Sequence, residues 1–342
     1  MPILMAAASS HAPSLFQSTF EGWERMHHRL NDGHPQPPET ELENEQLIGE
    51  RMPRIKANFA RMKREYAKFK PDVIITVLGD QREWFDGSNI PNLLVYTGPD
   101  TWTVHNTGQM DEDPPADPYS ERFRYPLRVD QDLAKQVLNG LLEQGFDAAF
   151  TTEMGPQSQP GRGVPHGVGN VVPHAHPSLD VPIVPVFVNV DDGPPVIMNG
   201  ERCVALGRAI AKIVEHSPKR ILITGSGGMS HDPRGLRSGW VDEPQDHWFG
   251  QQLLDGNVEA LKSMFSFRSE LFKGGGGELR TWIVAAAAID YMKPGHRASW
   301  FDYMPARKVT TGCGWVTWPA IDEPATKPKA TRSRKEEPVA AG

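Results

Sequence analysis

Short apolar runs of strand length alternate along the chain with segments in which apolar residues recur every three or four positions. The apolar runs predict buried strands at Ile3–Ala8, Val73–Leu78, Leu93–Thr97, Ala148–Thr152, Ile183–Val190 and Ile221–Thr224. The periodic segments each give one apolar helix face, and they predict helices at 55–69, 133–141, 206–214, 246–264 and 279–292. Strands separated by helices are typical of an α/β layer fold, so we expect a single α/β domain whose central mixed sheet is flanked by helices.

Three of the predicted strands are followed by segments that carry residues suited to binding or catalysis. These segments are Ser9–Pro13, which contains His11, Gly79–Phe85, which is strongly polar, and Gly225–His231, which is rich in glycine. Ligands of open α/β sheets bind at the carboxyl ends of the strands, so we expect the three segments to face one crevice if their strands are parallel neighbours. A fourth segment, Pro165–His176, is predicted to be a loop and contains three histidines.

The residue types at these strand ends favour a metal site over the other common catalytic motifs. His11 together with the carboxylates of Asp80, Glu83 and Glu243 forms a mixed nitrogen and oxygen donor set, which suits Fe(II), Mn(II) or Zn(II). The chain has no GxSxG motif of a serine hydrolase, and its glycine-rich segments lack the spacing of a dinucleotide or phosphate-binding loop. The run Gly274–Gly277 predicts either an anion-binding helix start or a flexible connection.

Composition and charge exclude several classes of protein. The formal net charge is −7, whereas nucleic-acid-binding proteins carry a basic surface, so we expect no nucleic-acid partner. No apolar run approaches the length of a membrane-spanning helix, and the N-terminus lacks the pattern of a signal peptide. The only cysteines, Cys203 and Cys313, suit a reducing compartment, so we expect a cytoplasmic protein. Residues 323–342 are polar and basic, and we expect them to be disordered beside a folded domain at 1–322.

Six motifs occur in an order that resembles one known superfamily over about residues 1–320. The motifs are SSHAPSLF, VIITVLGDQREWFDGSNIP, PHG, SGGMSHDPRG, EPQDHWFGQQLLDG and GELRTWIVAAAA. Together they resemble the class III, or LigB-type, extradiol ring-cleavage dioxygenases, the superfamily of the catalytic subunit of protocatechuate 4,5-dioxygenase. The resemblance implies a LigB-like α/β domain, Fe(II) as cofactor, a small aromatic substrate and O₂ as partners, and assembly as a homo-oligomer.

The resemblance also implies roles for individual residues. His11 matches the first iron-binding histidine, and His166 matches the histidine that acts as acid and base beside the substrate. Glu243 is the best match to the iron-binding glutamate, with Asp246 as the competing position. Apart from the resemblance, the positions of five further residues suggest that they support the site or contact substrate: His231, Ser230, Trp84, Asn170 and His174.

The chain departs from the family pattern at Gln81, which stands where the family has its second metal-binding histidine. A neutral amide oxygen is a weaker ligand for Fe(II) than an imidazole nitrogen. Three outcomes follow: iron is still bound with Gln81, Glu83 or Asp80 as the substitute ligand, another divalent metal is bound, or the site works without metal.

The predicted function is extradiol ring cleavage of a small catecholic or phenolic aromatic acid by Fe(II) and O₂, with His166 as the acid and base. One alternative is a metal-independent or altered-metal hydrolase, decarboxylase or C–C lyase acting on an aromatic acid in the same cleft. A further alternative is a non-catalytic relative that binds aromatic ligands.

Overall fold

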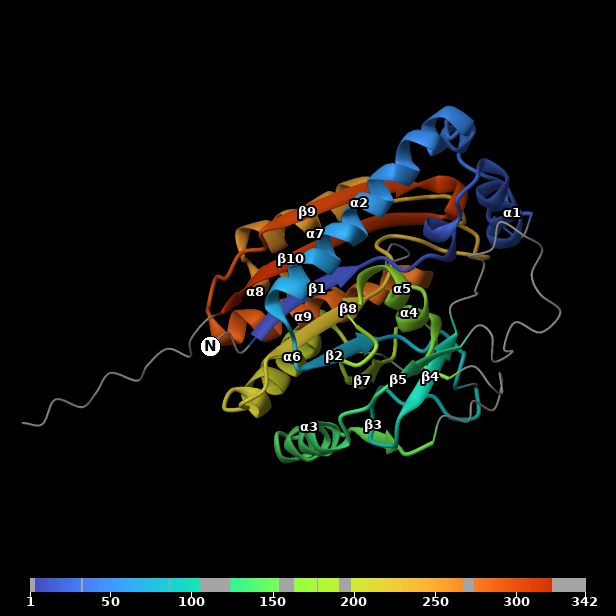
Figure 1. Cartoon of the computed structure of the whole chain (residues 1–342). Coiled ribbons are helices and arrows are strands. Elements are labelled where there is room, and N and C mark those ends of the chain that lie inside the picture. Colours follow the sequence, from blue (N-terminus) through green and yellow to red (C-terminus); the bar gives the residue numbers. More distant parts are fainter. Residues whose placement is uncertain are drawn as a thin grey trace, which may run out of the picture.

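The computed structural model describes residues 4–31, 33–85, 87–104, 124–153, 163–176, 178–190, 198–266 and 274–321. An eight-stranded mixed sheet forms its centre (Figure 1). In spatial order its strands are β6 (Ala149–Thr151), β3 (Leu93–Tyr96), β7 (Ile183–Val188), β2 (Val73–Leu78), β8 (Ile221–Ser226), β1 (Leu4–Ser9), β10 (Thr311–Ile321) and β9 (Trp300–Ala306). Strands β4 (Thr101–Val104) and β5 (Arg124–Leu127) form a separate antiparallel ribbon.

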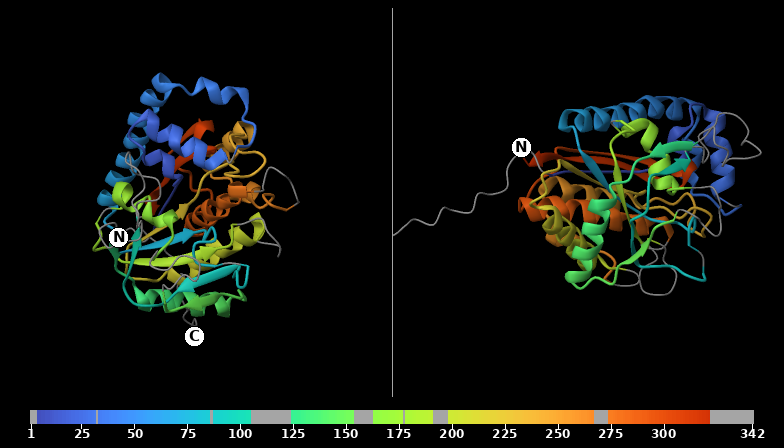
Figure 2. Two further views of the ribbon diagram at one scale, coloured as in Figure 1. Left: turned by 90° about the vertical axis from the view of Figure 1, so that its right-hand side faces the viewer. Right: turned by 60° about the horizontal axis from the view of Figure 1, so that its bottom comes forward.

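Helices cover both faces of the sheet, as the two further views show (Figure 2). One face packs against α3 (Gln131–Glu143), α6 (Gly200–Val214) and α9 (Leu279–Met292), and the other packs against α2 (Glu45–Phe69), α4 (His166–Gly169) and α5 (Val172–Ala175). Strand side chains alternate between these faces: in β1, Leu4 and Ala6 join the first core, and Met5 and Ala7 join the second. The remaining helices are α1 (Phe20–Asn31), α7 (Glu243–Asp255) and α8 (Val258–Leu261).

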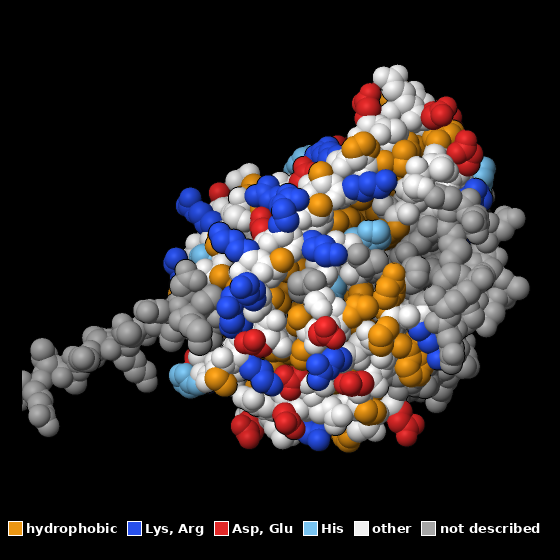
Figure 3. Space-filling model, in the orientation of Figure 1, with side chains coloured by type: hydrophobic (Ala, Val, Ile, Leu, Met, Phe, Trp, Pro, Cys, Tyr) orange, Lys and Arg blue, Asp and Glu red, His pale blue; other side chains and the backbone are white. Residues whose placement is uncertain are grey.

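The amphipathic pattern of α2 is visible on the molecular surface. Its apolar residues are buried in the second core, whereas basic side chains gather along its solvent face (Figure 3). The helix ends at Phe69, and Lys70 follows in the left-handed conformation before Pro71. The predicted end of this helix is therefore confirmed, while its start lies ten residues earlier, at Glu45 instead of Ile55, because Asn44 caps it by accepting a hydrogen bond from the backbone N–H of Leu47.

All six predicted strands are present, and the mixed α/β fold with a flanked central sheet is confirmed. The helix predicted at 246–264 was wrong as a single element, because Gly256 adopts φ 69° and ends α7 before α8 begins. The loop predicted at Pro165–His176 contains the short helices α4 and α5. The predicted tail at 323–342 lies outside the described residues, and no helix in the described ranges is long and apolar enough to cross a membrane.

Strands β2, β8 and β1 are adjacent and parallel, so their carboxyl ends meet at one edge of the sheet. This edge faces the viewer in the left panel of Figure 2. The prediction that the three segments after these strands share one crevice is confirmed, since residues of all three line one cavity. Helix α9 also begins at this edge. Its close approach requires Gly225, because a Cβ atom there would lie 2.6 Å from the carbonyl oxygen of Thr281.

Candidate active site

A cavity of about 550 Å³ opens at the carboxyl edge of β1, β2 and β8. This volume lies within the range of small-molecule sites. Residues with imidazole, carboxylate or amide side chains line it, although they come from segments far apart in the sequence. They are His11, Gln81, Glu83, His166, His231 and Glu278. The structure therefore brings together His11, Gln81, Glu83 and His231, as their positions after the strands suggested, and adds His166 from the fourth segment and Glu278.

The hydrogen bonds of His11 fix which of its ring nitrogens faces the cavity. Ser226 Oγ donates to the carbonyl oxygen of Gly167 and lies 2.9 Å from His11 Nδ1. Because the hydroxyl has one proton and gives it to Gly167, Nδ1 must carry the proton that His11 donates to Ser226. The neutral ring therefore presents the lone pair of Nε2. Asn170, which is fully buried, donates to the carbonyl oxygen of His11 at 3.0 Å and holds the backbone in place.

Glu278 supplies the carboxylate that faces His11 at the cavity floor, and it was missed by the sequence reasoning. It is 2 % exposed; its Oε1 lies 3.6 Å from His11 Nε2, and its Oε2 lies 3.6 Å from His231 Nε2. Burial raises the pKa of Glu278, but attraction to His11 and His231 outweighs that effect and holds the pKa below its ordinary value. A carboxylate facing the Nε2 lone pair of His11 needs a hydrogen-bond donor or a cation beside it, and the Gln81 amide N–H, a proton on the ring or a metal ion could each serve.

Gln81 extends its amide group to the same point, with Nε2 at 3.3 Å from His11 Nε2. Rotating the amide by half a turn exchanges its nitrogen and oxygen without moving the chain, and would place the oxygen there. Gln81 and Arg82 adopt φ values of 50° and 61°, the left-handed region that is costly for residues other than glycine.

His166 and Glu83 form a second unit on the wall of the cavity. The Glu83 carboxylate accepts one hydrogen bond from His166 Nδ1 and another, at 3.0 Å, from the His166 backbone N–H. The two bonds fix the ring and keep a proton on Nδ1, the arrangement by which a carboxylate orients a catalytic histidine. The ring of His166 meets the ring of His11 edge to face, with the centroids 4.7 Å apart. Glu83 thus contacts His166 and is not directed toward His11.

Three other carboxylates that the sequence offered as metal ligands are engaged elsewhere. Glu243 pairs with Arg307, and Asp246 is fully buried and accepts hydrogen bonds from Ser230 and Tyr303. Neither Glu243 nor Asp246 is among the residues that line the cavity. Asp80 accepts the backbone N–H groups of Trp84 and Phe85 and so shapes its own loop. The structure does not bring these three carboxylates to His11.

The remaining candidates divide between support of the site and packing. His231 lines the cavity, and its Nδ1 donates to the carbonyl oxygen of Met229 at 2.7 Å. Ser230 binds Asp246, and Trp84 donates to the carbonyl oxygen of Gly163 while stacking on Phe187. His174 is exposed and stacks on Phe16 with the ring centroids 4.7 Å apart, so its ring does not line the cavity.

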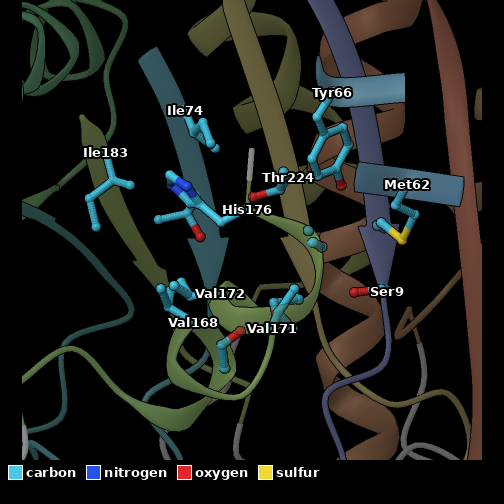
Figure 4. A pocket seen from close by; sticks show the side chains of 16 residues that line it. Ser9, Met62, Tyr66, Ile74, Val168, Val171, Val172, His176, Ile183 and Thr224 are labelled. Carbon is cyan, nitrogen blue, oxygen red and sulfur yellow. Dashed lines mark hydrogen bonds between the residues drawn. The ribbon is translucent and has the colours of Figure 1, made fainter. Parts of the chain in front are cut away.

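A second, smaller cavity of about 50 Å³ lies between the sheet and helices α2, α4 and α5 (Figure 4). Apolar side chains dominate its wall, including those of Met62, Val168 and Val172. His176 lines this smaller cavity, and burial lowers the pKa of its imidazole to about 4. The third histidine of the 165–176 segment is thus a half-buried neutral side chain in the second cavity.

Asp246 makes the stability of the fold depend on pH. Burial raises its pKa to about 7, although hydrogen bonds from Ser230 and Tyr303 act in the opposite direction. Between about pH 4 and pH 7 the folded chain therefore holds a proton that the unfolded chain releases, so stability falls as pH rises. We expect Asp246→Asn to reduce this slope by up to about 1.4 kcal/mol per pH unit. Urea unfolding at several pH values measures the slope; exposed Asp255→Asn, on the same helix, should leave it unchanged, and an unchanged slope in Asp246→Asn would contradict the prediction.

The donor groups at the cavity floor are of types that bind divalent metal ions. They differ from the two histidines and one carboxylate that the family resemblance implies. His11 Nε2, Glu278 and the Gln81 amide offer one nitrogen, one carboxylate and one neutral oxygen. Within the described ranges, no three His, Cys, Asp or Glu side chains converge in a way that could hold a metal. A metal at this floor would therefore rely on Gln81 or on solvent and substrate for its further ligands.

Curated relatives resemble parts of the chain. A 2,3-dihydroxyphenylpropionate/2,3-dihydroxicinnamic acid 1,2-dioxygenase from Rhodococcus sp is 30% identical over 172 residues, 49% of this chain and 48% of the relative. A dioxygenase of the same name from Photorhabdus laumondii is 32% identical over 237 residues, 56% of this chain and 71% of the relative. The chain thus spans about half the length of the first relative and more of the second.

Two further comparisons concern fold and family. The crystal structure of an uncharacterized Escherichia coli K12 protein aligns with 75% of this chain and 91% of its own, at 14% identity and a TM-score of 0.39, a similarity too low to support an argument. The model of the family described as the catalytic LigB subunit of aromatic ring-opening dioxygenase matches residues 2–313. Because that match covers most of the chain, this protein belongs to the LigB family, as its sequence motifs predicted.

Proposed function

We propose that this protein opens the ring of a small catecholic aromatic acid with O₂, in an extradiol reaction that uses Fe(II). The observation that carries the proposal is the meeting of His11, Glu278 and the His166–Glu83 unit in one cavity of a LigB-family chain. The relatives named as 2,3-dihydroxyphenylpropionate dioxygenases support a catechol with a carboxylate side chain as the substrate class.

His11 and Glu278 would hold the iron, with Gln81 as a weak third ligand. Bound iron would supply the redox chemistry between a catechol and O₂. The protein's own contribution begins with orientation: Ser226 and Asn170 fix His11, so that the Nε2 lone pair points at Glu278. The neutral amide of Gln81 adds no charge, so we expect the site to bind Fe(II) less tightly than a site with a second histidine.

His166 would move the phenolic proton of the substrate. Glu83 keeps Nδ1 protonated, which leaves Nε2 as the basic atom of the ring, and the same carboxylate stabilises the imidazolium once Nε2 has taken a proton. The ring of His166 lies against that of His11, so a catechol at the cavity floor comes within its reach. The same histidine can return the proton to the substrate during ring opening.

An oxygen-uptake assay tests the proposed function. Protein loaded with Fe(II) under argon is mixed with 2,3-dihydroxyphenylpropionate and air, and we expect one O₂ to be consumed per substrate, with both oxygen atoms retained in the opened product. Labelled ¹⁸O₂ and mass spectrometry follow the two atoms. Substrate that stays intact across a panel of catecholic acids, with iron bound, would contradict the proposal.

A second candidate function is an oxygen-independent reaction on an aromatic acid, such as hydrolysis, decarboxylation or C–C cleavage. It is favoured by the absence, within the described ranges, of three converging His, Cys, Asp or Glu side chains, and by the sequence resemblance that puts Gln81 where the family has its second metal-binding histidine. It keeps His166 and Glu83 as the proton-transfer unit and needs no iron. Conversion of an aromatic acid in the absence of O₂, at the same rate with and without iron, would favour this reaction over ring opening.

Assembly as a homo-oligomer remains a prediction from the family resemblance. Sedimentation analysis at micromolar concentration measures the state directly.

A further inference from the structure

Strained backbone conformations concentrate at the large cavity. Six non-glycine residues of the described ranges have positive φ, and four of them line this cavity: Gln81 (50°), Arg82 (61°), Arg234 (62°) and Thr310 (58°). Such conformations cost energy and persist where the surrounding structure enforces them, and they gather at functional sites. Two of the four, Arg82 and Arg234, are arginines.

Arg29 is the third arginine of the cavity lining, and the three come from separate parts of the fold. Arg29 lies in the last turn of α1, Arg82 follows β2, and Arg234 lies in the segment after β8. All three are exposed, whereas His11 and Glu278 are buried. The arginines therefore lie on the solvent side of the cavity, and the proposed reaction groups lie at its floor.

The acidic and basic side chains of the cavity occupy different parts of it. Its two carboxylates, Glu83 and Glu278, face the histidines: Glu83 binds His166, and Glu278 lies between His11 and His231. Within the described part of the chain, the guanidinium groups of Arg29 and Arg234 form no ion pair with a carboxylate. The solvent side of the cavity thus presents cationic groups suited to an anion.

We infer that Arg29, Arg82 and Arg234 bind the anionic side-chain group of the substrate and so select catechols that carry a carboxylate. This inference rests on the proposed function for the position of the ring, which would lie at the His11–Glu278 floor. A guanidinium presents paired N–H donors that match the two oxygens of a carboxylate. Gln81 and Arg82, two consecutive residues in the left-handed conformation, connect the floor of the cavity with its solvent side. Gln81 reaches His11 at the floor, and the exposed Arg82 lines the same cavity.

Anaerobic calorimetry with two matched ligands tests the inference without turnover. The ligands are 3-(2,3-dihydroxyphenyl)propionate and its primary amide, which is neutral and nearly the same in shape. We expect the unmodified protein to bind the acid at least about tenfold more tightly than the amide, because hydrogen bonds to charged groups are the stronger ones. We expect Arg82→Gln and Arg234→Gln each to weaken binding of the acid about 10- to 100-fold and to leave binding of the amide unchanged.

Two further variants separate the recognition of a carboxylate from a general effect of charge. Arg234→Lys keeps the charge but loses the paired donors, so it should retain part of the preference for the acid. Arg237→Gln removes a charge from the same segment at a residue that does not line the cavity, and it should change neither affinity. Arg29→Gln, on the exposed face of a helix, provides a cavity variant with little risk to folding.

The outcomes distinguish this inference from the proposed function. Equal binding of acid and amide, failure of both to bind, or equal weakening of both by the arginine variants would overturn the inference. Selective binding of the acid without any oxygen uptake would leave the inference standing and contradict the proposed reaction. Oxygen uptake at equal kcat/KM for the acid and the amide would support the proposed reaction and contradict the inference.

Discussion

Replacing Glu278 with glutamine is expected to abolish iron retention and to lower turnover by about 10³-fold, since a bound metal contributes several kcal/mol to such a reaction. Glutamine keeps the shape of the side chain but removes the charge that faces His11 Nε2 at 3.6 Å. Elemental analysis after desalting measures the iron, and oxygen uptake measures turnover. The two losses should appear together, because the account assigns one role to this carboxylate.

Glu243→Gln is the matched control for Glu278→Gln. The same atoms change, but the Glu243 carboxylate pairs with Arg307 and does not line the cavity. We expect iron content and turnover close to those of the unmodified protein. A loss of iron in Glu243→Gln with full retention in Glu278→Gln would support Glu243 as the metal-binding glutamate, as the sequence resemblance implied, and would contradict the assignment of Glu278.

Replacing His166 with alanine is expected to lower kcat by about 10²- to 10⁴-fold, the contribution of a positioned general acid and base. Iron retention should stay unchanged, because His166 contacts Glu83 and the ring of His11 and is not one of the proposed ligands. Oxygen uptake with 2,3-dihydroxyphenylpropionate across pH 5 to 9, compared between the variant and the unmodified protein, measures the loss. The variant should also lose the limb of the pH–rate profile that reports ionisation of the imidazole.

His174→Ala separates this effect from a general loss of imidazole near the site. His174 is exposed and stacks on Phe16, outside the cavity lining. Its removal should leave kcat within about twofold, since surface substitutions change little. Turnover unaffected in His166→Ala, or reduced equally in both variants, would remove His166 as the acid and base.

The parts of the fold that the sequence predicted are those built from continuous apolar runs. Strand β2 matches its prediction at both ends, because every residue of Val73–Leu78 is buried between two helix layers. Strands β9 and β10 were not predicted, since Trp300–Ala306 mixes polar residues with apolar ones and Thr311–Ile321 contains two glycines. Helix α1 was also missed; only a few of its residues are buried, so its apolar face is narrow.

In the candidate site, the sequence likewise predicted residues that follow a strand and missed one whose position depends on long-range packing. His11 and Gln81 follow strands directly, so a local pattern was enough to place them in the crevice. Glu278 depends on where α9 packs, which no local pattern reveals. One signal was nevertheless present in the sequence: every residue from Trp282 to Ile289 is apolar, which is typical of a helix buried on all sides. An acidic residue just before such a helix is expected to be buried as well and to need a partner.

Iron binding at equilibrium tests the central claim most directly. The unmodified protein, His11→Ala and Gln81→His are dialysed anaerobically against a series of Fe(II) concentrations, and iron per chain is measured by elemental analysis. The account predicts one iron per chain at saturation in the unmodified protein, its loss in His11→Ala, and affinity on the order of tenfold or more higher in Gln81→His, where imidazole replaces the amide. If the unmodified protein binds no more iron than His11→Ala at any concentration, the proposed iron site at His11, Glu278 and Gln81 is contradicted.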